Sequence, residues 1–146
     1  MKPGLAIALT AGAGGLVAMQ APINGMLGKS AGKLAAASIS FMIGTAVLVA
    51  ITAVSGSEVN LSAAAKLPWY YFIGGLLGAA YVTTVLITVN TLGAGGVTAA
   101  TIAGQLSTSV VLDRVGAFGL PEKQITLARL AGVALLAAGV FLIVRE

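Results

Sequence analysis

Long apolar runs separated by short polar connections dominate the chain. The runs cover residues 4–27, 34–54, 68–89, 93–112 and 126–144. About 20 apolar residues in a helix cross a bilayer core about 30 Å thick, and every run has about that length. The pattern therefore predicts an all-α integral membrane protein with five transmembrane helices, in which residues 1–146 form a single transmembrane domain.

Charged and aromatic residues mark the ends of these runs. Lys29 and Lys33 separate the first two, and Pro68 opens the third, where its missing N–H does no harm. Trp69 follows at once, and tryptophan is typical of the headgroup depth of a membrane. We expect the third helix to start at the interface and to reach the fourth through a short connection at residues 90–92.

The composition agrees with a membrane location and removes most catalytic chemistry. Hydrophobic residues make up 58% of the chain and charged residues 8%, against about 25% charged in a soluble domain. The sequence has no Cys and no His, which excludes Cys/His zinc sites, disulfides, thiol nucleophiles and Ser-His-Asp triads. We therefore expect no enzyme, no metal and no cofactor. The dispersed Lys and Arg residues also indicate no nucleic-acid partner.

The net charge of +4 is nearly balanced across the predicted membrane. Five crossings place the two termini on opposite sides. The N-terminal side then carries Lys2, Lys66, Arg114, Lys123 and Arg129, and the other side carries Lys29, Lys33 and Arg145. Because an excess of Lys and Arg normally fixes orientation, this distribution predicts insertion both ways and pairing with an inverted copy. The alternative is a weakly biased protein that its first helix orients.

Polar residues interrupt the first apolar run near its end. Gln20 and Asn24 are four residues apart and share a helix face, with Pro22 between them. Proline removes one helix hydrogen bond, and irregular backbone inside a membrane must line protein or a cavity. These three residues are candidates for a substrate site. The alternative is a kink whose amides satisfy the broken helix.

The fourth apolar run carries a polar stripe of Thr98, Thr101, Gln105 and Thr108, with Ser109 beside it. Gln105 is the large polar residue in the middle of this run, and its amide both donates and accepts hydrogen bonds. Thr101, Gln105 and Ser109 are therefore further candidates for substrate binding. A hydrogen bond between helices is the alternative for Gln105.

The third run adds Tyr81 and Thr84, which lie on one helix face. Tyr81 is near the middle of this run and is a candidate wall or hydroxyl for the same cavity. A core tyrosine bonded to a neighbouring backbone explains the residue equally well.

Small residues four positions apart allow two membrane helices to approach closely. The pairs Gly74 with Gly78 and Ala128 with Gly132 have this spacing. We expect helix packing at both pairs.

Asp113 is the one acid next to the polar stripe. It lies eight residues after Gln105, which is about 12 Å along a helix, so it marks the mouth of the predicted cavity. Arg114 and Arg129 are candidate ion-pair partners. The group is either a structural salt bridge or a gate.

Four sequence blocks resemble the YdcZ-like branch of the drug/metabolite transporter superfamily. The blocks are Gln20-Ala21-Pro22-Ile23-Asn24-Gly25, Ser40-Phe41-x-x-Gly44-Thr45, Trp69 leading to Gly74-Gly75-x-x-Gly78-x-x-Tyr81-Val82, and Gly104-Gln105-x-x-x-Ser109-x-x-x-Asp113-x-x-Gly116-x-x-Gly119. The resemblance implies a five-helix, multi-pass protein of the bacterial inner membrane. It also implies a chain that occurs as a dual-topology unit, as one of an oppositely oriented pair, or fused into a ten-helix form.

Together these observations predict half of an inverted-repeat, ten-helix transporter. The expected function is secondary-active transport of a small polar metabolite or drug-like solute by an antiparallel homodimer that works by alternating access. The expected partners are an inverted second copy, the lipid bilayer and the solute. The alternatives are a passive dual-topology channel and a non-transporting subunit of a membrane assembly.

Overall fold

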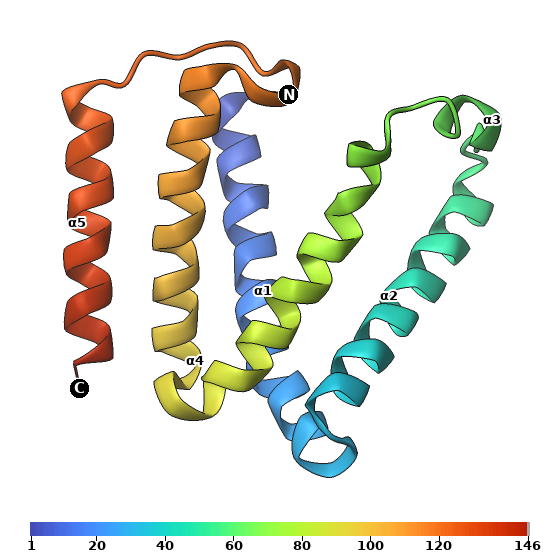
Figure 1. Cartoon of the computed structure of the whole chain (residues 1–146), viewed down its shortest axis with the longest axis horizontal. Coiled ribbons are helices and arrows are strands. Elements are labelled where there is room, and N and C mark those ends of the chain that lie inside the picture. The colour runs from blue at the N-terminus through green and yellow to red at the C-terminus, as the bar shows by residue number, and fades with distance from the viewer. Residues whose placement is uncertain (146) are drawn as a thin grey trace. The chain divides into compact units, whose positions relative to one another are not determined.

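The computed structural model describes residues 1–145, and all regular secondary structure in that range is helical (Figure 1). The elements are α1 (Pro3–Ala31), α2 (Lys33–Ser55), α3 (Leu61–Ala64), α4 (Ile73–Val115) and α5 (Leu127–Val144), with 3-10 turns at Trp69–Phe72 and Ala117–Gly119. Four stretches within the described range are long and apolar enough to cross a membrane. The prediction of an all-α membrane protein is confirmed.

Helix α4 is broken at Gly93. An unbroken helix of its 43 residues would be about 65 Å long, roughly twice the thickness of a bilayer core. The backbone of Gly93 has φ 68° and ψ 170°, a conformation that is open almost exclusively to glycine. The break divides α4 into residues 73–92 and 94–115, each long enough to cross the bilayer once. Five bilayer-length segments therefore lie within four helical stretches.

The break differs in place from the predicted connection. Residues 90–92, which we expected to link the third and fourth helices, are helical, and Gly93 alone within α4 is not. Asn90 and Thr91 are polar but adopt helical dihedral angles without strain, whereas Gly93 adopts the positive φ that ends the helix. The polar residues thus indicated the region of the break. The position of the break within that region is set by glycine, which can adopt a positive φ.

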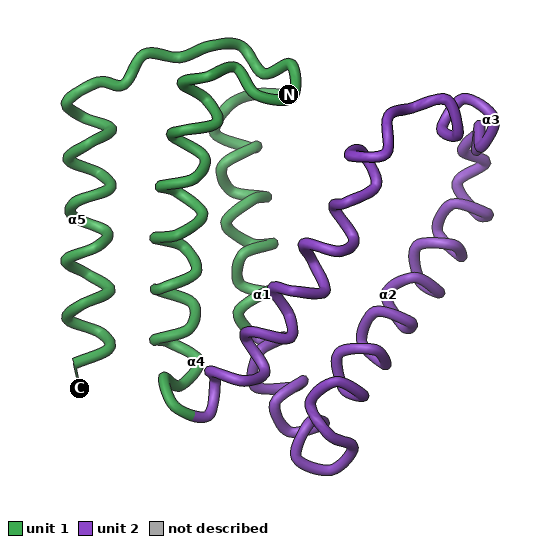
Figure 2. Tube along the Cα trace, in the orientation of Figure 1, with its two compact units in different colours: residues 1–18, 91–146 green, residues 19–90 purple. Residues whose placement is uncertain are grey.

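The structure contains two compact units, residues 1–18 with 91–146, and residues 19–90 (Figure 2). The first holds the start of α1, the second half of α4 and α5. The other holds the end of α1, α2, α3 and the first half of α4. The expectation that all segments form one transmembrane domain stays a prediction.

The core of the unit formed by residues 19–90 is small and built from closely packed helices. Ala36 and Ala37 of α2 pack against Val82 and Leu86 of α4, and Leu86 is only 1% exposed. The small alanine side chains let the two helices approach each other. This packing places the first half of α4 directly against α2.

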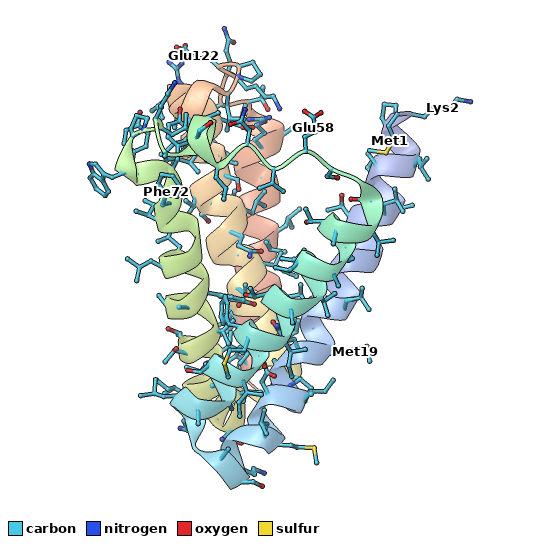
Figure 3. The ribbon with its side chains drawn as sticks, turned by 90° about the vertical axis from the view of Figure 1, so that its right-hand side faces the viewer. Met1, Lys2, Met19, Glu58, Phe72 and Glu122 are labelled. Atoms are coloured by element: carbon cyan, nitrogen blue, oxygen red, sulfur yellow. The ribbon has the colours of Figure 1, made fainter. Side chains whose placement is uncertain are left out.

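In the other unit, α5 runs antiparallel to the second half of α4 (Figure 1). A Cβ atom built on Gly96 would lie 3.5 Å from the side chain of Val144, so this glycine lets α4 and α5 approach closely. Most large apolar side chains project outward instead. Met19, for example, is 59% exposed and points away from the ribbon (Figure 3). Outward apolar surface of this kind suits contact with lipid.

Candidate functional site

Asn24 is the buried polar residue of α1. Its side chain is 5% exposed, and the hydroxyl of Ser40 in α2 donates a hydrogen bond to its Oδ1 atom at 2.5 Å. Gly25, the next residue, faces Val89 of α4 so closely that a built Cβ atom would lie 3.3 Å from that side chain. Asn24 therefore joins α1 to α2 where α1 also packs against α4.

The other two candidates on α1 are exposed. Gln20 and Pro22 both lie outside the core, and α1 continues as a helix through Pro22. Because proline has no N–H, the carbonyl of Ala18 lacks the donor that residue 22 would normally supply. The structure thus separates Asn24, which is satisfied within the chain, from Gln20, whose amide faces outward.

The candidates on α4 divide in the same way. Tyr81 is half-buried and packs against the core that contains Leu86. Thr84 is exposed, and its hydroxyl donates to the carbonyl of Ala80 in its own helix at 2.9 Å. Such a bond satisfies the hydroxyl within the helix. Tyr81 and Thr84 therefore have local structural contacts in this chain.

The polar stripe of the second half of α4 is mostly exposed. Gln105 and Ser109 lie at the surface, and Thr101 is half-buried. All three belong to the unit formed by residues 1–18 and 91–146, whereas Asn24 and Tyr81 belong to the other. A polar cavity lined by all the candidates together stays a prediction. Three cavities among residues 1–145 are lined by other residues, although Thr98 of the polar stripe borders one of them.

Asp113 holds together the connection between α4 and α5. Its Oδ2 atom lies 3.2 Å from Nη1 of Arg129 and 3.6 Å from Nζ of Lys123. The backbone N–H of Lys123 also donates to the carbonyl oxygen of Asp113 at 2.8 Å. Arg114, the other expected partner, is exposed and forms no salt bridge within residues 1–145. Asp113 therefore ties the connection back to the end of α4.

The ends of the helices explain why this pairing is needed. Asp113 lies in the last turns of α4, where the helix dipole disfavours a negative charge, and Arg129 lies in the first turn of α5, where it disfavours a positive one. Each charge offsets the unfavourable position of the other. The side chain of Thr126 caps α5 by accepting a hydrogen bond from the N–H of Arg129 at 3.3 Å.

Replacing Asp113 with Asn should destabilise this end of the protein. The Nη1 atom of Arg129 is buried and makes no hydrogen bond within residues 1–145, so the carboxylate of Asp113, 3.2 Å away, is the charge that compensates it. We expect the free energy of unfolding to fall by about 1–3 kcal/mol, because the substitution leaves this buried cationic group without its counter-charge. Thermal unfolding in detergent measures this. Glu122→Gln is the matched control, because Glu122 is exposed and forms no salt bridge among the described residues. Equal melting temperatures for the two variants would contradict the expectation.

The predicted small-residue pairs have different surroundings. A Cβ atom built on Gly78 would lie 3.4 Å from the ring of Phe41 in α2, so this glycine does permit close packing. Gly74 and Gly132 face open space, and Ala128 is exposed. Packing at these three positions stays a prediction that needs a second chain.

Sequence reasoning missed Ser40 and Lys123 as partners. Asn24 and Ser40 each lie eight residues from Gly32 along the chain. Gly32 separates α1 from α2, so a helical hairpin that turns there brings the two residues to the same level. That symmetry was readable from the sequence. Lys123 carried a weaker signal, because its pairing depends on the course of the connection after α4.

Residues 5–142 match the family described as "Putative inner membrane exporter, YdcZ". No curated protein and no solved structure matches the chain. The match covers nearly all of the sequence, and the helices of the described residues suit a protein that crosses the membrane several times. The family is one of membrane exporters rather than of enzymes. The chain therefore belongs to the YdcZ family and is a multi-pass protein of the inner membrane.

Proposed function

We propose that the protein is a secondary-active transporter of a small solute, in which two chains inserted in opposite orientations form a ten-helix unit. The two halves of the unit rock to open a central site alternately to each side of the membrane, as in other transporters built from inverted repeats. The match to an exporter family supports the transport role. The arrangement of the two chains rests on the chain's own residues.

The exposure of Gln105 is the observation that carries the proposal. This residue lies close to the middle of residues 94–115, the depth at which a helix that spans the bilayer meets the hydrocarbon centre. Its amide is exposed in the single chain, and polar side chains at that depth face a bundle interior or a water-filled cavity. A second chain that covers this face would supply both the interior and the cavity.

The near balance of Lys and Arg supports an inverted partner. With five residues on one predicted side and three on the other, the chain has little of the asymmetry that fixes one orientation. An inverted pair places the same polar residues on both halves of the site. This symmetry suits a solute path that opens to each side in turn.

Single cysteines just outside the two ends of α2 test the orientation. The chain has no natural Cys, and Ser30 and Ser57 are both exposed on either side of α2. We expect an impermeant thiol reagent added to intact cells to label about half of the Ser57→Cys population and about half of the Ser30→Cys population. Labelling of permeabilised cells, in which the reagent reaches both sides of the membrane, gives the total signal for each variant.

A fixed orientation gives a different result. One of the two variants would then be labelled completely and the other not at all, because α2 separates their positions by one membrane crossing. That outcome would end the dual-topology proposal. Each variant is the control of the other, since a general failure of the reagent would affect both.

A further inference from the structure

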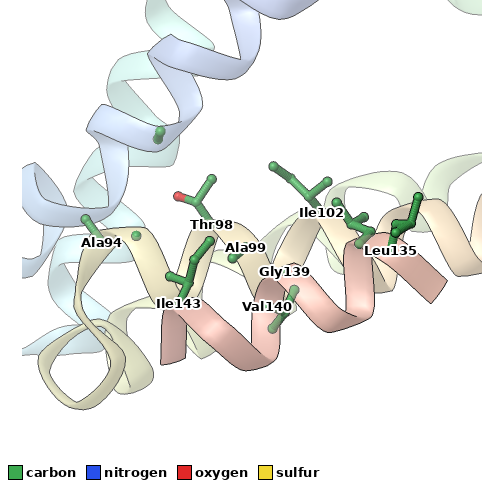
Figure 4. Close-up of a pocket in the computed structure, with 11 residues that line it drawn as sticks. Ala94, Thr98, Ala99, Ile102, Leu135, Gly139, Val140 and Ile143 are labelled. Atoms are coloured by element: carbon green, nitrogen blue, oxygen red, sulfur yellow. The ribbon is translucent and has the colours of Figure 1, made fainter. Parts of the chain in front are cut away.

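We infer that the unit formed by residues 1–18 and 91–146 contains a binding site for a small, uncharged, mostly apolar solute that carries one hydrogen-bond acceptor. The inference rests on the proposed transport function, and it names the class of solute that a site within one chain, separate from Gln105, would take. Its basis is a cavity of about 460 Å³ between α1, the second half of α4 and α5 (Figure 4). Sites for small molecules typically measure about 300–1,000 Å³.

The lining of the cavity is apolar except for one hydroxyl group. Its residues are Ala18, Ala94, Gly95, Thr98, Ala99, Ile102, Leu135, Leu136, Gly139, Val140 and Ile143. Because none of these side chains is charged, a charged solute would lose its hydration without gaining a counter-ion. The lining therefore selects a neutral molecule.

Small residues create the space. Gly95 of α4 and Gly139 of α5 both line the cavity, and a Cβ atom built on Gly139 would meet nothing within 4 Å. The larger lining residues Ile102, Leu135 and Ile143 are 46%, 74% and 53% exposed, so the cavity is an open groove rather than an enclosed chamber (Figure 4). The cavity thus results from the absence of side chains at defined positions on two facing helices.

Thr98 gives the cavity its polarity. Other hydroxyls of α4 donate to the carbonyl of the preceding turn at 2.8 to 2.9 Å, namely those of Thr84, Thr88 and Ser107. Thr98, like Thr101 and Thr108 of the same helix, makes no such bond within residues 1–145, and its side chain projects from α4 into the space that the lining residues border (Figure 4). A hydroxyl in an apolar site gains most from a ligand that accepts its hydrogen bond.

Benzophenone is a suitable probe, because it combines two apolar rings with one carbonyl acceptor and inserts into nearby C–H bonds on irradiation. We expect saturable labelling of the full-length protein in lipid nanodiscs, with adducts concentrated on residues 94–102 and 135–143. Diphenylmethane has the same rings without the carbonyl. It should compete about fivefold more weakly, the effect of one lost hydrogen bond.

Two pairs of variants locate the site. Thr98→Val should raise the half-saturating benzophenone concentration about fivefold, and Ser107→Ala should leave it unchanged, since the Ser107 hydroxyl is bonded to its own helix. Gly139→Leu fills the cavity and should abolish saturable labelling. Gly104→Leu is its control, because the added atoms at both glycines meet open space and Gly104 does not line the cavity.

Several results would overturn the inference. Adducts scattered over all helices, or saturable labelling that survives Gly139→Leu, would show that no solute site exists here. A lipid with a photoreactive acyl chain that labels the same residues and resists displacement by benzophenone would assign the cavity to lipid. These readouts measure binding, so they stand apart from the cysteine experiment: a fixed orientation would leave them unchanged, and their failure would leave the inverted pair intact.

Discussion

The Gly93→Ala variant is expected to have a free energy of unfolding about 1–3 kcal/mol below that of the natural protein. The loss is the cost of placing a side chain in a backbone conformation that almost only glycine tolerates. Gly93 has φ 68° and ψ 170°. Alanine has two ways to respond, and both are unfavourable. It either keeps the strained backbone, or it adopts helical angles and joins the two halves of α4 into a helix that no longer fits the bilayer.

Reversible unfolding in mixed detergent micelles measures this difference. Gly104→Ala is the matched control, because Gly104 is a helical residue of the same element and a Cβ atom there meets nothing within 4 Å. Alanine stabilises a helix by about 0.5–1 kcal/mol relative to glycine. The two substitutions should therefore change stability in opposite directions. A stabilised Gly93→Ala protein would show that the break in α4 is not required for the fold.

Leu86→Ala should have the second large effect, a loss of about 2–5 kcal/mol of unfolding free energy. Leu86 is 1% exposed and packs with Val82 against Ala36 and Ala37 of α2. Those alanines are already small, so they have little side chain with which to fill the space that the leucine leaves. The cost of a cavity rises when its surroundings cannot collapse into it.

Leu76→Ala provides the comparison for Leu86→Ala. Leu76 lies in the same half of α4 but is 70% exposed, so its truncation removes little internal packing. The same unfolding measurement should give a change of less than about 0.5 kcal/mol for this variant. Similar losses for the two leucines would mean that the pairing of α2 with α4 contributes little to stability.

The helices were predictable because the bilayer restricts the possibilities. Any spanning segment must satisfy its backbone internally and must match a fixed thickness, so apolar runs alone predict where helices lie. The predicted 34–54 and 126–144 correspond to α2 at Lys33–Ser55 and α5 at Leu127–Val144. The exact break in α4 was less predictable, since it depends on the dihedral angles of Gly93 rather than on hydropathy.

The environment of each polar residue was harder to predict than the helices. Gln20 and Asn24 share a helix face by their spacing, yet Gln20 is exposed and Asn24 is 5% exposed. The difference arises from the neighbours, because Ser40 of α2 reaches Asn24. Periodicity within one helix shows which residues share a face. Only the register between two helices shows which residues of the neighbour that face contacts. The same limit explains why Lys123 was missed as a partner of Asp113.

The hydrogen bond between Ser40 and Asn24 has a consequence for membrane insertion during synthesis. Both residues belong to consecutive helices joined at Gly32, so their bond needs no part of the chain beyond α2. Once α1 and α2 have left the ribosome, Ser40 is available to donate its hydrogen bond to the Asn24 amide. The hairpin can therefore leave the translocation channel with this polar pair satisfied, before the residues of α4 that pack against α1 and α2 have been translated.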